Sequence, residues 1–437
     1  MAVTARSIGA ALAQLGGAAS EAPGALAAAA IDGRTPRWVV TPRSVEQVAG
    51  VLALAHEEGL AVAPRGSGSA LDLGRPPRAL DIVLDLSGLT RVIEYSPEDL
   101  TVSVEAGVTA GALDGRLRGH RQWLPVDPPG RTPRTIGGLA ATAAHGPLRL
   151  RYGTLRDLLL GVRFVQADGV VTWGGARVVK SVTGYDVPKL MVGALGTLGV
   201  LVELTLRLHP RPATETTWLA TFPAADAAAG FVAGVVDSWL QPNRLEVLTA
   251  AALRACALPA AAVAVALAVG GVEAAVREQG SVAQGMAVGC GGTWTTAPAD
   301  FWDRCDQVFA KAQDDVVLQV SAPASRLAAT LGAIERRHAA LTAGADAMVT
   351  GCAPVGTLRV TLTGGDPDEL TALVEGLRED VGPGGGAVVL LAAGTALRER
   401  VDPWGPVDPG ALALMTALRD EFDSRHVLNP GRFVTAL

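Results

Sequence analysis

The sequence lacks the positive charge that marks proteins which bind nucleic acids. Only three of its 437 residues are lysine, and its 37 basic residues are outnumbered by 43 acidic ones, so the net charge is −6. A protein that neutralises a phosphate backbone needs a clustered excess of positive charge. No basic block occurs in the chain, and we therefore expect no nucleic-acid partner.

Cysteine and histidine are scarce and widely spaced. The four cysteines, Cys256, Cys290, Cys305 and Cys352, form no C-x-x-C pair, and no two of the six histidines have the spacing of metal ligands. We expect no metal site, and thiols that are reduced and mostly buried. Because iron–sulfur clusters are held by grouped cysteines, electrons from a redox reaction would have to leave to another chain or to a diffusible acceptor.

Long apolar runs are missing as well. The most apolar segment, residues 257–272, is interrupted by Pro259 and two glycines and alternates valine with alanine. This pattern favours a buried strand over a membrane helix, which needs about 20 apolar residues. We expect no transmembrane segment and no signal peptide, and the first residues are typical of a short amphipathic helix.

The chain does contain two regions in which strands and helices alternate, separated by a proline-rich break at residues 209–212. In the first region, residues 44–58 predict a helix that begins after the capping residue Ser44 and ends at Gly59. Strands are expected at residues 60–64, 81–86, 101–105, 159–166, 170–173 and 198–208.

The second region has longer units, typical of helices layered on an antiparallel sheet. Strands are expected at residues 218–221, 245–249, 262–269, 316–320 and 358–362. Helices are expected at residues 226–239, 272–279, 325–343 and 366–379, with an internal loop at 292–300. A last helix, residues 409–423, is expected to dock onto an earlier domain.

Two glycine-rich segments are candidate ligand-binding loops. The glycines of RGSGS, residues 65–69, allow successive backbone N–H groups to converge on an anion, but the segment lacks the third glycine and the helix of the G-x-G-x-x-G fingerprint. Alone, it is either a phosphate loop or a tight turn. The small residues that begin with TIGG, residues 135–138, allow a flat ligand to approach the backbone, or a helix to pack tightly through alanines.

A third glycine-rich stretch is VGALGTLGV, residues 192–200, which places glycine at every third position around Leu195. Together with RGSGS, TIGG, RYG (151–153) and GYDVPKLM (184–191), it resembles the FAD-binding domain of the vanillyl-alcohol oxidase and p-cresol methylhydroxylase (PCMH) family. The resemblance covers residues 41–211.

The resemblance implies an α+β fold with a PCMH-type two-part FAD-binding domain. An α+β cap-type domain with an antiparallel sheet would follow, and the C-terminal helix would return to the FAD domain. The expected divisions are a helical N-terminal extension (1–36), the FAD-binding domain (37–212), the cap domain (213–394) and the C-terminal segment (395–437).

In this family the first loop surrounds the FAD pyrophosphate and TIGG lies along the flavin. Members that bond FAD covalently through this loop have histidine where this chain has Ser69, so the resemblance implies non-covalent FAD. The FAD-binding residues that it implies are Pro64, Arg65, Gly66, Ser67, Gly68, Ser69, Pro128, Thr135, Gly137, Gly138, Ala141, Gly146, Tyr152, Gly153, Val200 and Asn429.

Within the family, residues 180–199 (KSVTGYDVPKLMVGALGTLG) are similar to the flavin subunits of D-2-hydroxyacid dehydrogenases, including D-lactate dehydrogenase and glycolate oxidase. Those catalytic members typically have Gly-Ser-Glu-Gly where this chain has GALG at residues 193–196, with Leu195 in place of the acid. They also have a His-x-Gly-Asp-Gly-Asn segment that this chain lacks.

The segments VDPWGP (401–406) and EFDSRHVLNPGRF (421–433) are similar to the closing motifs of the E-subunit type of bacterial glycolate oxidase. By this similarity Asn429 and Arg432 would return to the flavin domain, although Asn-Pro-Gly is also an ordinary turn sequence. The similarity implies a catalytic flavin subunit and an iron–sulfur subunit as partners. It also implies a cytoplasmic location, with contact to the inner face of the membrane made through those partners.

Three functions therefore stay open. The chain is an FAD-binding subunit of a glycolate oxidase complex that supports oxidation of glycolate or D-lactate and relays electrons to the iron–sulfur partner. Alternatively it is a self-sufficient FAD-dependent dehydrogenase or oxidase of a small 2-hydroxy acid or a sugar alcohol, or a structural FAD-binding pseudo-enzyme. Oxidation of a hydroxy acid needs a base and a cation. The sequence offers Arg149, Arg151, His145 and Tyr185 and assigns no catalytic residue among them.

Overall fold

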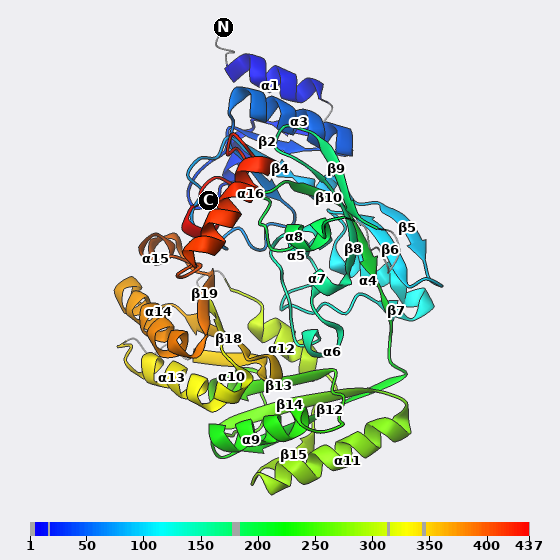
Figure 1. Ribbon diagram of the computed structural model, residues 1–437, viewed down its shortest axis with the longest axis vertical. Coiled ribbons are helices and arrows are strands. Elements are labelled where there is room, and N and C mark those ends of the chain that lie inside the picture. The colour runs from blue at the N-terminus through cyan, green and yellow to red at the C-terminus, as the bar shows by residue number, and fades with distance from the viewer. Residues whose placement is uncertain (1–4, 16–17, 177–183, 313–314, 343–346, 437) are drawn as a thin grey trace.

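The computed structural model describes residues 5–15, 18–176, 184–312, 315–342 and 347–436 (Figure 1). In this part of the chain the strands form a four-stranded, a five-stranded, a two-stranded and an eight-stranded sheet. The first three sheets lie in the upper half of Figure 1 and the eight-stranded sheet, which we call the large sheet, lies in the lower half. The expected α+β class is confirmed.

The four-stranded sheet contains the strand that leads into RGSGS. Helix α3 (Val45–Glu58) begins after Ser44, whose side chain accepts a hydrogen bond from the Gln47 N–H, and ends at Gly59 with a φ of 66°, as the sequence predicts. Helices α1 (Ala5–Gln14) and α2 (Pro23–Ala28) flank the sheet. Its strand order is β1 (Ala18–Ser20), β2 (Trp38–Thr41), β4 (Ile82–Asp85) and β3 (Val62–Arg65).

The five-stranded sheet is antiparallel throughout and stands beside the first. Its order is β5 (Val92–Ser96), β6 (Thr101–Glu105), β10 (Val200–Arg207), β8 (Leu159–Val165) and β9 (Val171–Gly175). A two-stranded pair, β7 (Gln122–Trp123) and β11 (His209–Pro210), lies at its end. Its helices are α4 (Ala110–Leu117), α5 (Ile136–Ala141), α6 (Arg149–Tyr152), α7 (Leu155–Leu158) and α8 (Val187–Met191).

The large sheet is also antiparallel. Its order is β15 (Thr293–Thr296), β12 (Thr214–Phe222), β14 (Val263–Gly271), β13 (Arg244–Thr249), β17 (Ala347–Cys352), β18 (Thr357–Thr363), β16 (Asp315–Ser321) and β19 (Ala387–Ala392). Its strands include all five that the sequence predicts in this region. The apolar 257–272 segment supplies β14, which is a fully buried strand as expected.

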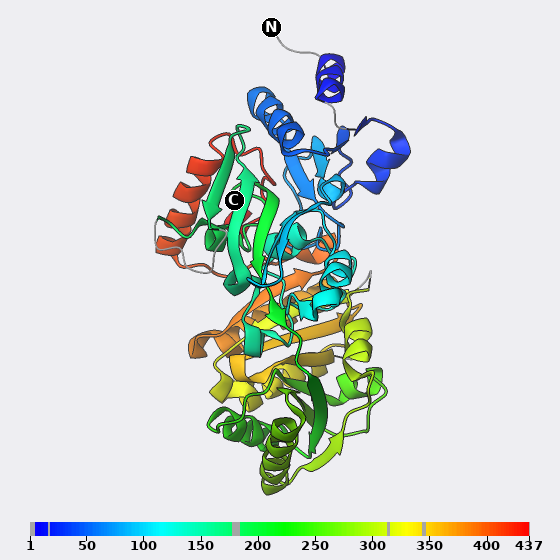
Figure 2. The ribbon, with the colours of Figure 1, turned by 90° about the vertical axis from the view of Figure 1, so that its right-hand side faces the viewer.

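Helices cover the two faces of the large sheet unequally. The outer face packs against α9 (Ala225–Val236), α11 (Glu273–Gly289), α13 (Leu327–Ala339) and α14 (Pro367–Val381) and contains most of the core. The inner face points toward the other sheets (Figure 2) and carries α10 (Ala250–Ala255) and α12 (Phe301–Phe309) near one end only. The rest of this inner face is left to line a cavity.

One expectation for this region is wrong. Residues 292–300 are not simply a loop, because β15 pairs with β12 and extends the sheet by one edge strand. Three of its four residues are exposed threonines, and only Trp294 packs against the core, so the segment carries little apolar pattern. In addition, α11 runs to Gly289, ten residues beyond the end that the sequence predicts.

The C-terminal segment returns to the four-stranded sheet, as expected. Helices α15 (Thr395–Arg400) and α16 (Pro409–Phe422) lead into a loop in which the Asn429 N–H donates to the Val62 carbonyl, at 2.8 Å. The four cysteines are free thiols, and three of them are buried. Within the described residues, no helix combines the length and apolar character needed to cross a membrane.

Candidate functional site

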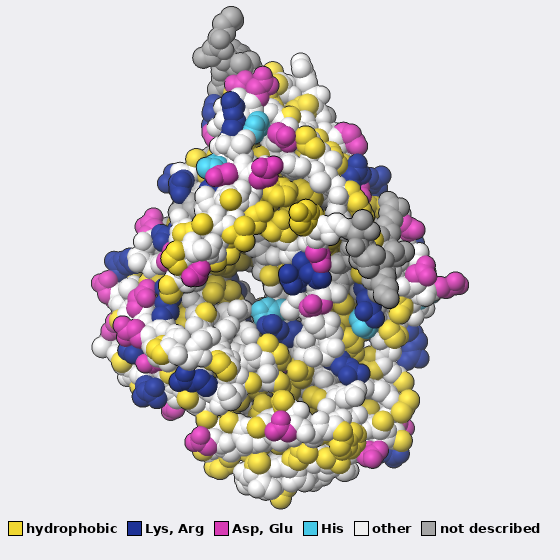
Figure 3. Space-filling view, viewed as in Figure 1, with side chains coloured by type: hydrophobic (Ala, Val, Ile, Leu, Met, Phe, Trp, Pro, Cys, Tyr) yellow, Lys and Arg dark blue, Asp and Glu magenta, His cyan; other side chains and the backbone are white. Residues whose placement is uncertain are grey.

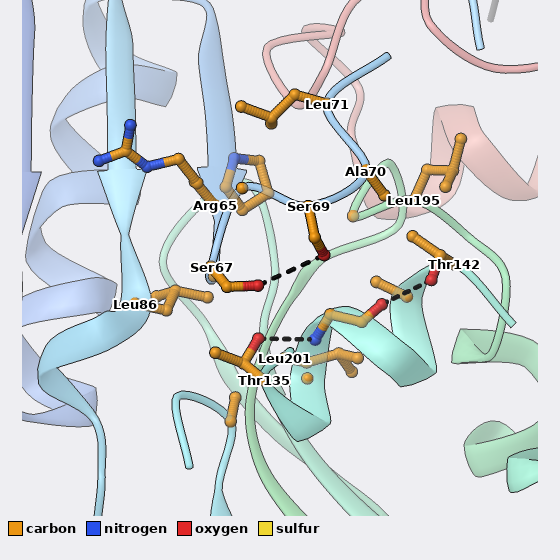
Figure 4. Close-up of a pocket in the computed structure, with 18 of the residues that line it drawn as sticks. Arg65, Ser67, Ser69, Ala70, Leu71, Leu86, Thr135, Thr142, Leu195 and Leu201 are labelled. Carbon is orange, nitrogen blue, oxygen red and sulfur yellow. Dashed lines mark hydrogen bonds between the residues drawn. The ribbon is translucent and has the colours of Figure 1, made fainter. Parts of the chain in front are cut away.

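A cavity lies where RGSGS, α5, the start of β10 and the C-terminal loop meet (Figure 4). The glycines of the loop are needed for this convergence. A Cβ on Gly66 would clash with the Thr135 hydroxyl, which accepts a hydrogen bond from the Gly138 N–H at 3.2 Å and so caps α5. Gly68 has a φ of 77°, in the region that favours glycine.

Side chains of the loop point in two directions. The Arg65 guanidinium is directed away from the loop, where it donates to Asp85 on β4 at 2.5 Å. Ser67 and Ser69 approach each other to 3.4 Å between hydroxyl oxygens and point toward Thr135 across the cavity. The loop therefore offers backbone N–H groups and two hydroxyls, while the arginine anchors it to the sheet.

The opposite wall combines the VGALGTLGV turn with the C-terminal loop. Leu195 adopts a φ of 51°, donates its N–H to the Ala141 carbonyl and accepts the Asn429 side-chain amide at 2.6 Å. The other amide atom, Asn429 Oδ1, is buried without a hydrogen-bond partner among the described residues. Of residues 180–199, which carry the similarity to dehydrogenase subunits, 180–183 lie outside the described residues.

Twelve of the sixteen residues expected to bind FAD line this first cavity, and four do not. Pro128 and Gly146 line a second, larger cavity. Tyr152 and Gly153 line neither, and the Tyr152 ring instead packs edge-on against Trp123 and His209. The twelve are Pro64, Arg65, Gly66, Ser67, Gly68, Ser69, Thr135, Gly137, Gly138, Ala141, Val200 and Asn429.

The second cavity has a volume of about 1150 Å³ and lies between the inner face of the large sheet and the other sheets. It is continuous with the first, because Ser69, Leu71, Arg134, Thr142 and Leu195 line both. The surface is hollowed at the same level in Figure 3, and basic side chains and a histidine gather beside the hollow. A ligand in the first cavity can therefore present one end to the second.

The floor of the second cavity is a polar strip on the large sheet. The strand register places Thr350 of β17 opposite Arg359 of β18, and Arg359 opposite Gln319 of β16. Side chains that face each other on adjacent strands lie about 5 Å apart. All three line the cavity, so a guanidinium stands between a hydroxyl and an amide.

Two arginines in this cavity lack partners that would neutralise them. The Nε atoms of Arg134 and Arg359 are buried and have no hydrogen-bond partner within the described chain. Burial and the positive charge of Arg134 together lower the pKa of Arg359 to about 10, although the charge of Asp315 acts in the opposite direction. Two cations that face one cavity without a carboxylate between them form a site for an anion.

His145 and Arg149 line the same cavity from the side of the flavin-type segments. Burial, together with the charge of Arg149, lowers the pKa of His145 to about 4, so the imidazole is neutral at pH 7. The Arg149 guanidinium reaches the hydroxyl of Thr357 on β18, at 3.4 Å. The other two candidates are elsewhere: Arg151 does not line the cavity, and Tyr185 is 95% exposed.

A buried charge cluster closes one end of the floor. Arg244 donates to Asp127 at 3.2 Å and to Glu215 at 2.6 Å, which ties the large sheet to the segment before TIGG. Burial raises the pKa of Asp127 to about 6, although Arg244 favours its charged form. Next to this cluster, Glu246 is 5% exposed and its Oε1 has no partner among the described residues.

The chain has the fold of PCMH-type FAD-binding proteins. Residues 36–175 match a family model described as an FAD binding domain. The structure of p-cresol methylhydroxylase with substrate bound has a TM-score of 0.80 with this chain at 17% identity, covering 98% of this chain and 97% of that one. For 4-ethylphenol oxidase from Gulosibacter chungangensis the TM-score is 0.77 at 15% identity, with the same coverage.

More particularly, about half of the chain is similar to enzymes named for 2-hydroxy acids. The matched part is 34% identical to the probable mitochondrial D-lactate dehydrogenase of Danio rerio, over 51% of this chain and 45% of that protein. It is 33% identical to the glycolate oxidase subunit GlcD of Bacillus subtilis, over 49% of this chain and 45% of that protein. These matches therefore span less than half the length of the relatives.

The residues of the first cavity fit FAD. The loop presents backbone N–H groups without side-chain obstruction at its glycines, as a pyrophosphate requires. Asn429 Oδ1, an acceptor with no protein partner among the described residues, is held at the wall by the bond from its amide nitrogen to Leu195. The expected cofactor, FAD, is thus supported by the family model and by the chemistry of the cavity.

Proposed function

We propose that this chain is the flavin-carrying part of a dehydrogenase that oxidises a small 2-hydroxy acid to the 2-oxo acid. The observation that carries the proposal is the pair of arginines, Arg134 and Arg359, whose Nε atoms have no hydrogen-bond partner among the described residues and which line a cavity continuous with the FAD cavity. An anionic substrate held there is within reach of a neutral imidazole. The names of the relatives, D-lactate dehydrogenase and glycolate oxidase, support the same substrate class.

Different side chains of the second cavity bind the substrate and accept its proton. Arg359 and Arg134 bind the substrate carboxylate, and the amide of Gln319 beside Arg359 fixes its orientation. His145, neutral at pH 7, accepts the proton of the substrate hydroxyl. Bound FAD supplies the two-electron acceptor for the carbon centre. Arg149 stabilises the negative charge that develops at the hydroxyl oxygen.

The cofactor-binding residues and domain limits are part of the proposal. The twelve residues of the first cavity bind FAD, without a covalent bond at Ser69, and Pro128 and Gly146 contact it from the second cavity. The chain divides into residues 1–36, 37–212, 213–394 and 395–437.

Electrons leave the chain through a partner. The matched relative from Bacillus subtilis is named as a subunit, which supports membership of a complex. We propose a second flavin subunit and an iron–sulfur subunit as partners, a cytoplasmic location, and contact with the inner face of the membrane through those subunits.

Anaerobic reduction of the purified holoprotein tests the proposal. The yellow protein is mixed with glycolate or D-lactate, and bleaching of the flavin absorbance is followed in a stopped-flow instrument, with free FAD as the control. We expect bleaching by at least one acid and no bleaching of free FAD. A protein that holds FAD but stays oxidised with every 2-hydroxy acid, with and without its partner subunits, would contradict the proposal.

A further inference from the structure

Glu246 is a buried acid in the floor of the second cavity that the proposed reaction does not use. It lies on β13 between Arg244 and Leu248, and all three line the cavity because alternate residues of a strand share one face. One carboxylate oxygen lies 3.4 Å from the Thr350 hydroxyl, and the other, Oε1, has no partner among the described residues. A buried acceptor without a donor is costly, so its retention needs a reason.

The groups beside Glu246 are hydroxyls and a thiol. The register places Glu246 opposite Cys352, Cys352 opposite Thr357, and Thr357 opposite Ser321, which forms a second polar row next to the row of Arg359. Neighbouring residues of the two rows are two positions apart along each strand, because alternate residues of a strand share one face. A molecule whose carboxylate is held at Arg359 can therefore extend its carbon chain along this second row.

The chemistry of the second row favours hydroxyl groups over a second carboxylate. An unpaired carboxyl oxygen needs a donor, and an ionised carboxylate has none to give. A hydroxyl both donates and accepts, and so it can satisfy Glu246 Oε1 and accept a bond from Thr357 or Ser321, while Thr350 donates to the other oxygen of Glu246. The terminal torsion of a glutamate side chain is broad, so Oε1 can turn to meet such a donor.

We infer that Glu246 and the hydroxyls of Thr350, Thr357 and Ser321 form a subsite for a further hydroxyl group of the substrate. The substrate is then a 2-hydroxy acid that carries at least one more hydroxyl, of the glycerate and short aldonate class, rather than glycolate or lactate. This inference rests on the proposed function. The volume of about 1150 Å³ agrees with it, because glycolate would leave most of the space beside the FAD cavity to water.

The burial of Glu246 also favours a hydroxyl group as its ligand. Burial and the charge of Asp127 raise the pKa of Glu246 well above its ordinary value. The raised pKa shows that the cavity by itself stabilises the charged carboxylate poorly, which favours a ligand that brings a donor to it. A site built to bind a substrate hydroxyl discriminates strongly against an analogue that lacks it, because its buried groups are then left unpaired.

The experiment compares kcat/KM for flavin reduction with glycolate, D-lactate, both glycerates, erythronate, threonate and malate. We expect at least one polyhydroxy acid to exceed D-lactate on the order of 100-fold, since a hydrogen bond to a charged or buried group contributes about that much. If glycolate or D-lactate equals the best polyhydroxy acid, or if malate is preferred, the inference is overturned while the proposed function stands. If no acid reduces the flavin, the proposed function itself fails.

Two variants test the role of Glu246 directly. Glu246→Leu should lower the ratio of kcat/KM for the best polyhydroxy acid to that for D-lactate by on the order of 10- to 100-fold, whereas Glu246→Gln, which keeps an acceptor, should restore most of it. Glu335→Leu, which removes an exposed carboxylate of α13, is the control and should leave the ratio unchanged. If Glu246→Leu does not fold, Ser321→Ala is the second variant, because it removes another hydroxyl of the subsite. The dissociation constant of the polyhydroxy acid for the oxidised Ser321→Ala protein, read from the flavin spectrum, should then rise on the order of 10-fold. A ratio that does not change in Glu246→Leu, or a dissociation constant that does not change in Ser321→Ala, refutes the subsite.

Discussion

Replacing Arg359 with leucine should change activity and stability in opposite directions. The guanidinium is held between Thr350 and Gln319 by the register of the sheet, and its Nε has no partner among the described residues. In the folded protein without substrate, this buried positive charge lowers the free energy of unfolding. Burial and Arg134 lower its pKa from 12.5 to about 10, and each pKa unit corresponds to about 1.4 kcal/mol, so the charge costs the fold about 3 kcal/mol.

Arg359→Leu therefore removes a destabilising charge and leaves an apolar side chain in a cavity wall. We expect the free energy of unfolding to stay the same or to rise, by at most about 3 kcal/mol. The same change removes one or two charge-assisted hydrogen bonds to the substrate carboxylate, each worth about 1.5–3 kcal/mol, so kcat/KM should fall on the order of 100- to 1000-fold. Opposite effects of this kind are typical of residues kept for function.

Urea unfolding at a fixed excess of FAD and anaerobic flavin reduction measure the two quantities on the same preparations. Arg277→Leu is the matched control, because Arg277 lies on α11, on the outer side of the large sheet, in an exposed ion pair with Glu273. That variant should lose less than about 1 kcal/mol and keep full activity. A loss of stability above 2 kcal/mol in Arg359→Leu, on the order of a broken structural ion pair, or an unchanged kcat/KM would refute the reasoning.

Three further predictions concern other parts of the chain. The pKa of His145 near 4 means that the free enzyme keeps its base unprotonated at pH 5; kcat/KM should therefore fall only as the pH approaches 4, and His145→Gln should remove that limb of the profile. Arg398 is 1% exposed and forms an ion pair with Asp32. Asp32→Ala removes this carboxylate and should lower the free energy of unfolding in urea by about 3–5 kcal/mol, far more than Asp368→Ala, which removes an exposed one. Leu195→Glu should keep FAD, since Leu195 contributes its backbone to Ala141 and Asn429, and should not raise kcat/KM for glycolate; a gain in turnover from this change alone would argue against the assigned carboxylate site.

The segments that line the first cavity carry signals in the sequence that are local. The loop RGSGS and the segment TIGG are each a few consecutive residues, and their glycines are required by a clash or by a positive φ that a single chain segment determines. The cap of α3 and the bounds of β6, residues 101–105, follow from equally local signals. Whether these segments meet is not a local property. The placement of Tyr152 beside Trp123, away from both cavities, illustrates this.

The floor of the second cavity could not be predicted in the same way. Thr350, Arg359 and Gln319 belong to three strands, and they become neighbours only through the order of the large sheet. A signal was present, because Arg359 and Glu246 are charged residues at polar positions of strands in which polar and apolar residues largely alternate. The edge strand β15 had little such signal, since it consists of three threonines and Trp294, which pairing with β12 brings onto Trp218.

The position of Arg359 depends finally on one tight connection. The turn between β17 and β18 contains Gly356, which has a φ of 67° and lies so close to the Ala322 carbonyl that a Cβ would clash with it. This turn fixes Thr350 opposite Arg359. Because side chains alternate along a strand, a shift of one residue would turn Arg359 to the outer face, into the apolar core, and would bring Leu358 or Val360 into the cavity. The anion site is thus specified less by the arginine itself than by the glycine three residues before it, which is also why a search for charged motifs passes over it.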